Sequence, residues 1–277
     1  MNKHFVILFL LFLFYVYILF HSHDLSFFDI VAPPTEIKKV AVIFPYRDQA
    51  VQNRSEHLRK TLEYYQKLNI PNIDFYVIEQ GNDKKFNRGI LINAGHDLIK
   101  KSGKNYVNEI HHDIDVQPDA TLIKYFYSKD VIACKKAFYD HFFGTLSVMP
   151  VHIMDKVNGY SNNFWGWGVE DDNLSARLTH HGIKVYNADP ALTKLVELPH
   201  KNAWELNIVN PERHVVDDKD RAEGYVSGLA DGFCFQKYRL PLLLLLLKKF
   251  KYFLLIKEKF NLAIKCQVAM EIKGLSL

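Results

Sequence analysis

The first half of the chain alternates between short apolar runs and segments whose apolar residues recur every three or four positions. Runs of the first kind predict buried strands, and segments of the second kind predict amphipathic helices. In chain order the prediction is strand 38–48, helix 55–69, strand 73–80, helix 86–103 and strand 106–118. Strands that alternate with helices indicate an α/β fold whose central sheet is mostly parallel, with right-handed crossover connections.

The stretch NNFWGWGVEDDN, residues 162–173, places three consecutive acids directly behind two tryptophans and two glycines. The acids begin a predicted helix that ends near Gly182, and the helix dipole favours negative charge at such a position. Helix capping would account for one or two acids but leaves the preceding WGWG unexplained. Because sugars stack on flat aromatic faces and glycine permits a tight turn, Trp165 and Trp167 indicate a site that binds sugar hydroxyls.

Charged residues gather at the ends of the predicted strands, where parallel sheets bind their ligands. Asp113 and Asp115 are one residue apart, so in an extended chain both carboxylates face the same side and can share a metal ion. Their oxygen atoms suit Mg²⁺ or Mn²⁺. Arg47 and Arg88 suit phosphate oxygens, which a guanidinium binds in a bidentate manner. Each feature alone is more often a turn, a cap or a surface ion pair, but together they predict a nucleotide-sugar site.

Composition limits the classes of protein that the chain can represent. Its 277 residues are 48% apolar and 14% aromatic, enough for one sizeable domain with a full core. The formal net charge of +4 is small, and the basic-aromatic pattern of nucleic-acid-binding proteins is absent, so we expect no nucleic-acid partner. The three cysteines allow at most one internal disulfide and show no zinc-site spacing. Asn53 and Asn173 begin N-glycosylation motifs.

The N-terminus carries an apolar run over residues 5–20, preceded by one lysine. No small-residue cleavage site follows, so we expect an uncleaved signal anchor (1–22) rather than a cleaved signal peptide, with the rest of the chain outside the cytosol. A short stem (23–38), a main domain (39–238) and a basic amphipathic tail (239–277) complete the predicted organisation. The apolar runs of the tail are too short to span a bilayer, which leaves a membrane-surface segment or a helix packed on the domain.

In this order, the motifs VAVIFPYRD, FNRGILINAG, HHDID, FFGTLSV and NGYSNNFWGWGVEDDN resemble the β-1,4-galactosyltransferase family. The resemblance covers roughly residues 39 to 215, and the gaps between the motifs also fit. HDID and the later HKNAW are most similar to the branch that galactosylates xylose on proteoglycan core proteins. The resemblance implies a GT-A-like nucleotide-sugar glycosyltransferase fold and an inverting transferase that uses Mn²⁺ and a UDP-sugar donor.

Roles for individual residues also follow from the resemblance. The residues of the donor site would be Pro45, Tyr46, Arg47, Asp48, Gln49, Phe86, Asn87, Arg88, Asp113, Ile114, Asp115, Phe142, Trp167 and His200. Asp115 and His200 would bind the metal ion, with Glu197 as a further candidate ligand. The acceptor sugar would bind to Glu170, Asp171, Asp172 and Arg213. Asp171 would be the general base that activates the accepting hydroxyl, with Glu170 or Asp172 as the next candidates.

The implied reaction is transfer of galactose from UDP-galactose to a sugar hydroxyl of a glycoprotein, proteoglycan or glycolipid, which forms a β-1,4 linkage. With the apolar N-terminus, this implies a single-pass type II protein of the Golgi membrane whose catalytic domain is lumenal. Three positions depart from the family pattern, since Phe142 replaces tyrosine, Thr145 replaces glycine and Gln49 replaces a basic residue. The alternatives are therefore an N-acetylgalactosaminyltransferase of the same fold and a sugar-binding relic without turnover.

Overall fold

A seven-stranded sheet organises the computed structural model, which describes residues 38–136, 139–206, 208–232, 234–235, 267–268 and 270–271. The strands are β1 (Lys39–Tyr46), β2 (Ile73–Gln80), β3 (Tyr106–His112), β5 (Val131–Lys136), β6 (Tyr139–Pro150), β7 (Val185–Asn187) and β10 (Gln267–Val268). Their order is β10-β2-β1-β3-β6-β5-β7. Among the neighbouring pairs, β3–β6 and β6–β5 are antiparallel and the others are parallel. The predicted α/β fold with a mostly parallel sheet is confirmed.

Two short antiparallel ladders lie outside this sheet. In one, β4 (Val116–Pro118) pairs with β8 (Leu195–Glu197), and in the other β9 (Cys234–Phe235) pairs with β11 (Met270–Glu271). The first ladder matters for the site, because β4 follows Asp115 directly and β8 leads to His200. It therefore brings together two residues that are far apart in the sequence.

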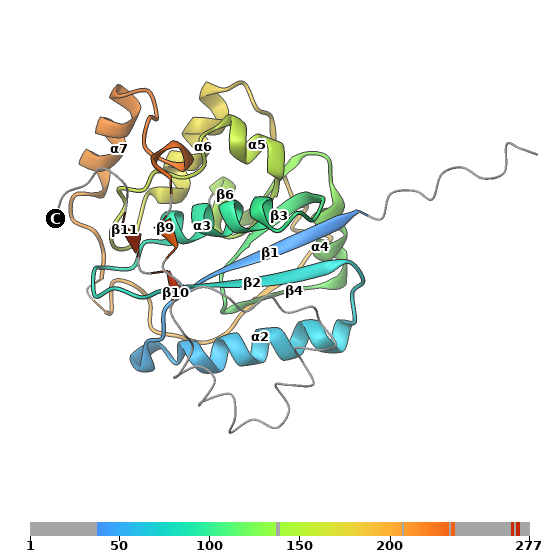
Figure 1. Cartoon of the computed structure of the whole chain (residues 1–277). Coiled ribbons are helices and arrows are strands. Elements are labelled where there is room, and N and C mark those ends of the chain that lie inside the picture. Colours follow the sequence, from blue (N-terminus) through green and yellow to red (C-terminus); the bar gives the residue numbers. More distant parts are fainter. Residues whose placement is uncertain are drawn as a thin grey trace, which may run out of the picture. The chain divides into compact units, whose positions relative to one another are not determined.

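Helices cover both faces of the sheet, with α2 on one side and α3 on the other (Figure 1). Strand β1 shows why, because Val40 and Phe44 share a hydrophobic cluster with α2, whereas Ala41 and Ile43 share one with α3. Successive side chains of a strand point to opposite faces, so this strand is buried on both sides. The helices are α2 (Arg54–Leu68), α3 (Arg88–Lys101), α4 (Ala120–Lys124), α5 (Val151–Lys156), α6 (Glu170–His180) and α7 (Arg213–Ala222), with 3₁₀ turns η1 (Ala50–Gln52), η2 (Tyr125–Tyr127) and η3 (Leu229–Asp231).

The strands and helices predicted for the first half of the chain are present, and the helix predicted after WGWG is α6. The third strand differs from its prediction. It ends at His112, because the chain turns through Asp113, Ile114 and Asp115 before β4 begins. Strand β3 then pairs with the antiparallel β6, a partner that the alternation of strands and helices did not predict.

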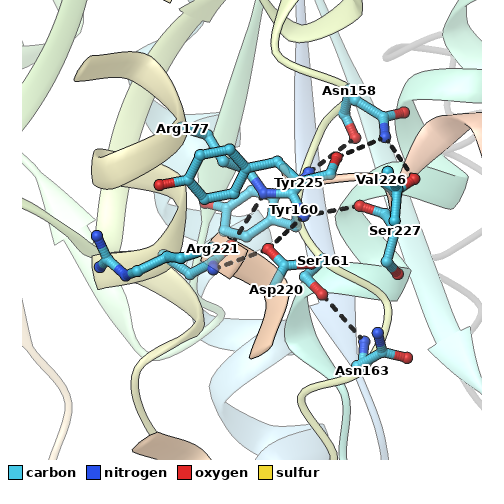
Figure 2. Close-up of polar contacts among 12 residues, drawn as sticks. Asn158, Tyr160, Ser161, Asn163, Arg177, Asp220, Arg221, Tyr225, Val226 and Ser227 are labelled. Atoms are coloured by element: carbon cyan, nitrogen blue, oxygen red, sulfur yellow. Dashed lines mark hydrogen bonds and ion pairs between the residues drawn. The ribbon is translucent and has the colours of Figure 1, made fainter. Parts of the chain in front are cut away.

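Arg177 joins α6 to α7 and to two loops. Its side chain is 0% exposed, and its guanidinium donates to two side chains and three backbone carbonyls. Figure 2 shows Arg177 with its partners Asp220, Ser227 and Asn158. The acceptors are Asn173 Oδ1 (2.9 Å), Asp220 Oδ2 (2.7 Å) and the carbonyls of Ser227 (2.7 Å), Gly159 (3.2 Å) and Asn158 (3.4 Å). A guanidinium has five N–H donors, so the buried charge is fully hydrogen-bonded. These bonds fix the direction of α6, whose first turn carries the three acids.

Asn173, the start of one N-glycosylation motif, belongs to the same buried cluster. It is 0% exposed, and its amide nitrogen donates to Asp217 Oδ1 and Asp220 Oδ2, each at 2.9 Å. Glycosylation needs an accessible asparagine, so Asn173 cannot be glycosylated in the folded chain. Asn53, which begins the other N-glycosylation motif, is exposed.

Several predictions concern residues outside the described part of the chain. These are the signal anchor (1–22), nearly all of the stem (23–38), residues 236–238 at the end of the main domain, and residues 239–266, 269 and 272–277 of the tail. None of the helices in the described residues is both long enough and apolar enough to cross a membrane. Two short pieces of the tail are described, since β10 pairs with β2 and β11 pairs with β9.

Replacing Arg177 with Met keeps the volume of the side chain but leaves the buried Asp220 carboxylate without its cation. We expect Arg177→Met to lower the free energy of unfolding by about 3–5 kcal/mol, measured by urea denaturation. Arg221→Met is the matched control, because Arg221 pairs with Asp217 on the neighbouring turn and its side chain is 41% exposed. Its effect should stay below about 1 kcal/mol, and equal effects for the two variants would contradict this role of Arg177.

Candidate active site

A cleft of about 410 Å³ opens where β1 and β3 end, next to the WGWG turn and the segment that carries His200. Most of the predicted site residues line it, although they come from segments far apart in the sequence. They are Pro45, Arg47, Gln49, Phe86, Arg88, Asp113, Ile114, Asp115, Phe142, Trp167, Glu170 and His200. The structure thus brings most of the predicted donor residues, both predicted metal ligands and the acceptor residue Glu170 to one place.

Three predicted donor residues lie beside the cleft lining rather than in it. Tyr46 is buried in the core that faces α2, and Asp48 is exposed next to it. Asn87 is 0% exposed and caps α3, since its Oδ1 accepts from the Ile90 amide at 2.9 Å. Its Nδ2 also donates to the Asn162 carbonyl at 2.9 Å. Asn87 therefore ties the start of α3 to the segment that leads into the WGWG turn.

Asp171, Asp172 and Arg213 also fall outside the residues that line the cleft. Asp171 nevertheless lies directly behind its wall, because a Cβ atom on Gly144 would be only 2.7 Å from Asp171 Oδ2. Glycine at this position is what allows the carboxylate to approach β6 so closely. Asp172 is exposed, and the charges of Asp217 and Arg221 on α7 act on it. Of the three acids, Asp172 is thus the one turned toward α7.

Glu170 is the acid whose environment is most unusual. It is 8% exposed, and its Oε2 has no hydrogen-bond partner among the described residues. Burial, followed by the nearby Asp171 carboxylate, raises the pKa of Glu170 to about 7, although the charge of Arg88 opposes this shift. A buried polar atom without a partner is costly, so a ligand hydroxyl that reaches Oε2 would gain a favourable contact.

The turn before α6 has an unusual backbone. Gly168 has a φ of 117°, and Val169, the N-cap of α6, has a φ of 72°. Positive φ is rare for a β-branched residue, whose side chain clashes with the backbone there. Hydrogen bonds hold the turn, since the Trp167 amide donates to the Ile208 carbonyl at 3.1 Å and the Asn210 amide to the Trp167 carbonyl at 3.0 Å. The tight turn expected from WGWG is present.

Arg88 lies buried at the base of the cleft. Its Nε donates to Asp113 Oδ1 at 2.9 Å, its Nη1 to the Tyr160 hydroxyl at 3.3 Å and its Nη2 to the Phe143 carbonyl at 3.2 Å. Burial lowers the pKa of Arg88, but the charge of Asp113 and its neighbours outweighs this effect and raises the pKa. Arg88 therefore supplies a permanent positive charge near Asp113 and Glu170.

A buried hydrogen-bonded chain supports Arg88 from behind. The Tyr160 hydroxyl lies 3.2 Å from His111 Nδ1, and His111 Nε2 donates to Glu109 Oε1 at 2.7 Å. His96 Nδ1 donates to the other Glu109 oxygen at 2.6 Å. Burial alone would raise the pKa of Glu109, but His96 and His111 lower it to about 2, and against the effect of burial Glu109 raises the pKa of His96 to about 9. The strand histidine His111 is thus part of the interior support.

Asp115 lies between a cation and a histidine. Its Oδ2 accepts from Arg54 Nη1 at 2.5 Å, and His200 Nδ1 is 3.3 Å from the same oxygen. Arg54, which follows η1 and opens α2, was not among the predicted site residues. One signal could have found it. Gln49 stands where the family has a basic residue, and Arg54 is the next basic residue along the chain.

The donor set around Asp115 fits a hard divalent ion. A carboxylate and an imidazole are both ligands that Mn²⁺ accepts, and Glu197 lines the same cleft. Within the residues that the structure describes, no group of three or more His, Cys, Asp and Glu side chains is arranged to hold a metal ion. A site with few protein ligands leaves positions for phosphate oxygens, as in many nucleotide sites. The residues therefore fit an ion that binds together with a nucleotide.

Phe142 and Thr145 shape the β6 wall of the cleft. The Phe142 ring lies so close to Gly144 that a Cβ atom there would be 2.5 Å from its Cζ. Thr145 is 8% exposed, and its Oγ1 has no hydrogen-bond partner among the described residues. Thr145 also lines a second cavity of about 160 Å³, together with Cys134 and Ala188. Thr145 therefore lines both cavities.

Two family models and several curated relatives match the chain. Residues 32–127 match the family model described as the N-terminal region of glycosyl transferase group 7, and residues 132–201 match the model described as the N-terminal domain of galactosyltransferase. These two matches cover more than half of the chain. The β-1,4-galactosyltransferase 4 of Cricetulus griseus is 32% identical over 188 residues, which are 64% of this chain and 53% of the relative. The chain spans about half the length of the curated relatives it matches.

Solved structures agree on the fold. The catalytic domain of Drosophila β-1,4-galactosyltransferase 7 in complex with xylobiose has a TM-score of 0.59 at 22% identity and matches 74% of this chain and 89% of its own. A mutant of the same enzyme in complex with manganese, UDP-Gal and xylobiose has a TM-score of 0.51 at 22% identity, with the same coverage. The predicted GT-A-like fold is confirmed. By its two family models and its curated relatives, the chain belongs to the β-1,4-galactosyltransferase family.

Proposed function

We propose that this chain is an inverting, Mn²⁺-dependent galactosyltransferase that transfers galactose from UDP-galactose to a sugar hydroxyl and forms a β-1,4 linkage. The observation that carries the proposal is the meeting of three groups around one cleft: Arg88 with Asp113, Asp115 with His200, and Glu170 with Asp171. The first two groups suit a diphosphate and its metal ion, and the third suits acceptor hydroxyls. The related Drosophila enzyme is in complex with manganese and UDP-Gal.

The donor would bind at the carboxyl ends of β1 and β3. Arg88 offers a guanidinium for the diphosphate, and Phe86 offers a flat apolar face for the base. Asp115 and His200 would hold Mn²⁺, which when bound would neutralise negative charge on the departing UDP. Arg54 contacts the same Asp115 oxygen, so it has to share or release that oxygen, and it then adds a second positive charge beside the phosphates.

The acceptor would bind over the acids of the WGWG turn. Inversion requires a base on the face opposite to the leaving UDP, where it takes the proton of the attacking hydroxyl. Asp171 is the proposed base, because its carboxylate reaches the β6 wall beside Gly144. Glu170, whose Oε2 finds no partner among the residues that the structure describes, would bind an adjacent hydroxyl. Trp167, which is 50% exposed, offers a stacking face that orients the sugar.

The choice of donor depends on Phe142 and Thr145. In the family, a tyrosine at the first position leaves room for a hydroxyl at the second carbon of the sugar and little for an N-acetyl group. Phe142 keeps this bulk and loses one hydrogen bond of roughly 0.5–1.5 kcal/mol, too little to reverse a steric preference. UDP-galactose is therefore the main candidate. The Thr145 hydroxyl has no hydrogen-bond partner in the described part of the chain, and Thr145 lines a cavity of about 160 Å³. Both features favour UDP-N-acetylgalactosamine as the second candidate.

The location and organisation of the chain belong to the same proposal. A signal anchor (1–22) and a short stem (23–38) would attach the catalytic domain (39–238) to the Golgi membrane, facing the lumen. The tail (239–277) would lie on the membrane surface or pack on the domain. The acceptor would be a glycan on a glycoprotein, proteoglycan or glycolipid. The prediction of the xylosylprotein branch for this chain rests on the motifs HDID and HKNAW.

The test is UDP release from a panel of UDP-sugars, with Mn²⁺ and with or without sugar acceptors. The proposal expects release from UDP-galactose that requires an acceptor, with a β-1,4-linked product by NMR. Release without an acceptor would indicate a hydrolase, and donor binding without release would indicate the sugar-binding relic. A preference for UDP-N-acetylgalactosamine that Thr145→Gly reverses would establish the second candidate.

Replacing Asp115 with Asn should abolish Mn²⁺-dependent transfer. We expect a loss of about 10²-fold or more, because the charge on the departing UDP loses its counterion. Binding of Mn²⁺, followed by electron paramagnetic resonance, should weaken in the same variant. Asp97→Asn is the control, since it alters a surface carboxylate that pairs with Lys101 on α3. Full activity of Asp115→Asn would remove this residue from the metal site.

Replacing Asp171 with Asn keeps the shape of the side chain and removes the proton acceptor. Loss of a general base typically lowers kcat by about 10²- to 10⁴-fold, while donor binding should persist. Asp218→Asn is the control, because Asp218 is an exposed acid on α7 that does not line the cleft. An unchanged kcat in Asp171→Asn would move the base to Glu170 or Asp172.

Glu170→Gln should stabilise the protein at pH 8 and leave it unchanged at pH 4. The folded-state pKa of about 7 lies above the ordinary value of 4.5, so folding favours the protonated acid. Stability therefore falls as the pH rises through this interval, and a neutral glutamine removes the loss. We expect a gain of roughly 1–3 kcal/mol at pH 8, measured by urea denaturation without donor or metal.

The control for this pH dependence is Glu223→Gln, which alters an exposed acid that pairs with Lys219 on the last turn of α7. It should change stability little at either pH. Equal effects of Glu170→Gln at pH 4 and pH 8 would show that the titration of Glu170 is not the cause.

A further inference from the structure

Two exposed tryptophans meet on the cleft. Trp167 is 50% exposed and Trp204 is 65% exposed. Their ring centroids are 6.1 Å apart and their planes are inclined at 66°, and both residues line the cleft of about 410 Å³. We call this pair the Trp167–Trp204 corner. Large exposed apolar groups beside a cleft indicate a binding surface. The ligand that covers the corner should therefore be one that also binds in the cleft.

The turn that carries Trp204 is fixed by its own hydrogen bonds. The Asn202 amide donates to Glu205 Oε2 at 2.6 Å, and the Glu205 amide donates back to Asn202 Oδ1 at 2.9 Å. The Ile208 amide donates to the Ala203 carbonyl at 3.1 Å, and Ile208 in turn accepts from the Trp167 amide. These bonds hold together the two backbone segments that carry the indole rings.

The surroundings of the corner suit a carbohydrate. The guanidinium carbon of Arg213 is 5.7 Å from the centroid of the Trp204 ring, and the exposed Asn202 and Glu205 lie on the same turn. A pyranose has an apolar C–H face and a polar edge, so it can pack on an indole while its hydroxyls reach such groups. An apolar protein segment or a lipid surface would leave these charged and polar groups without partners.

We propose that Trp204 is a specificity-determining residue that binds the second sugar of an oligosaccharide acceptor, so that this site favours an acceptor of at least two sugar units over the single protein-linked xylose of the xylosylprotein branch. Trp167 faces the accepting sugar beside the acids, and Trp204 extends the same aromatic surface to the sugar linked to it. For turnover the inference rests on the proposed transferase function. Binding of the acceptor does not require turnover and can be measured by itself.

The experiment compares two pairs of probes: methyl β-xyloside with xylobiose, and methyl β-N-acetylglucosaminide with diacetylchitobiose. Binding is followed by tryptophan fluorescence, and transfer by UDP release from UDP-galactose with Mn²⁺. The variants are Trp204→Ala and Trp204→Tyr, with Val215→Ala as the control because Val215 is 68% exposed on α7 and does not line the cleft.

The wild-type protein should bind at least one disaccharide more tightly than its monosaccharide partner. Trp204→Ala should remove this advantage, with a rise of about tenfold in the Kd and KM of the disaccharide and little change in kcat or in the monosaccharide values. Trp204→Tyr should recover most of the loss. Equal binding of both members of each pair by the wild-type protein, or equal losses for both in Trp204→Ala, would overturn the proposal. If no UDP is released from any donor, the proposed function fails, and the binding measurements still decide the role of Trp204.

Discussion

The site depends on one buried cation. Asp113, Glu170 and Asp171 approach one another from two separate parts of the chain, and their negative charges would repel if nothing lay between them. Arg88 supplies the opposite charge through its bond to Asp113, and the Tyr160–His111–Glu109 chain holds it in place. Because this support consists of protein groups alone, the cleft keeps its charge pattern in the absence of ligand. That is the condition for electrostatic stabilisation without reorganisation during the reaction.

Much of this architecture can be predicted from the sequence, for physical reasons that are local. The strands and helices follow from the spacing of apolar residues, as in β1, whose continuous apolar run reflects burial on both faces. The grouping of Arg88 with Asp113 and Asp115 follows because parallel strands end at one edge of the sheet. The WGWG turn follows from glycines that tolerate positive φ. The assignment of roles to these residues came from the family resemblance rather than from the pattern itself.

Features that depend on distant contacts could not be predicted in this way. Arg54 reaches Asp115 only because η1 places it at the start of α2, and the spacing of apolar residues gives no sign of that contact. The partnership of β3 with β6 depends on where the chain returns after the small ladders form. In the sequence Arg177 is an ordinary helix residue, because its partners Asp220 and Ser227 lie 43 and 50 residues further along the chain. The role proposed for Trp204 depends on its closeness to Trp167, which the sequence does not indicate.

The backbone of Val169 has a consequence for how such a site can change over evolutionary time. A φ of 72° is costly for a β-branched residue and cheap for glycine, so position 169 lies away from its stability optimum. Substitutions that relax the turn are therefore expected to increase the stability of the folded state. Their persistence would depend on whether a looser turn still delivers the acids of α6 to the cleft. Selection for thermal stability in the laboratory would therefore favour glycine at position 169. Selection for turnover would show whether the strained valine is needed for activity.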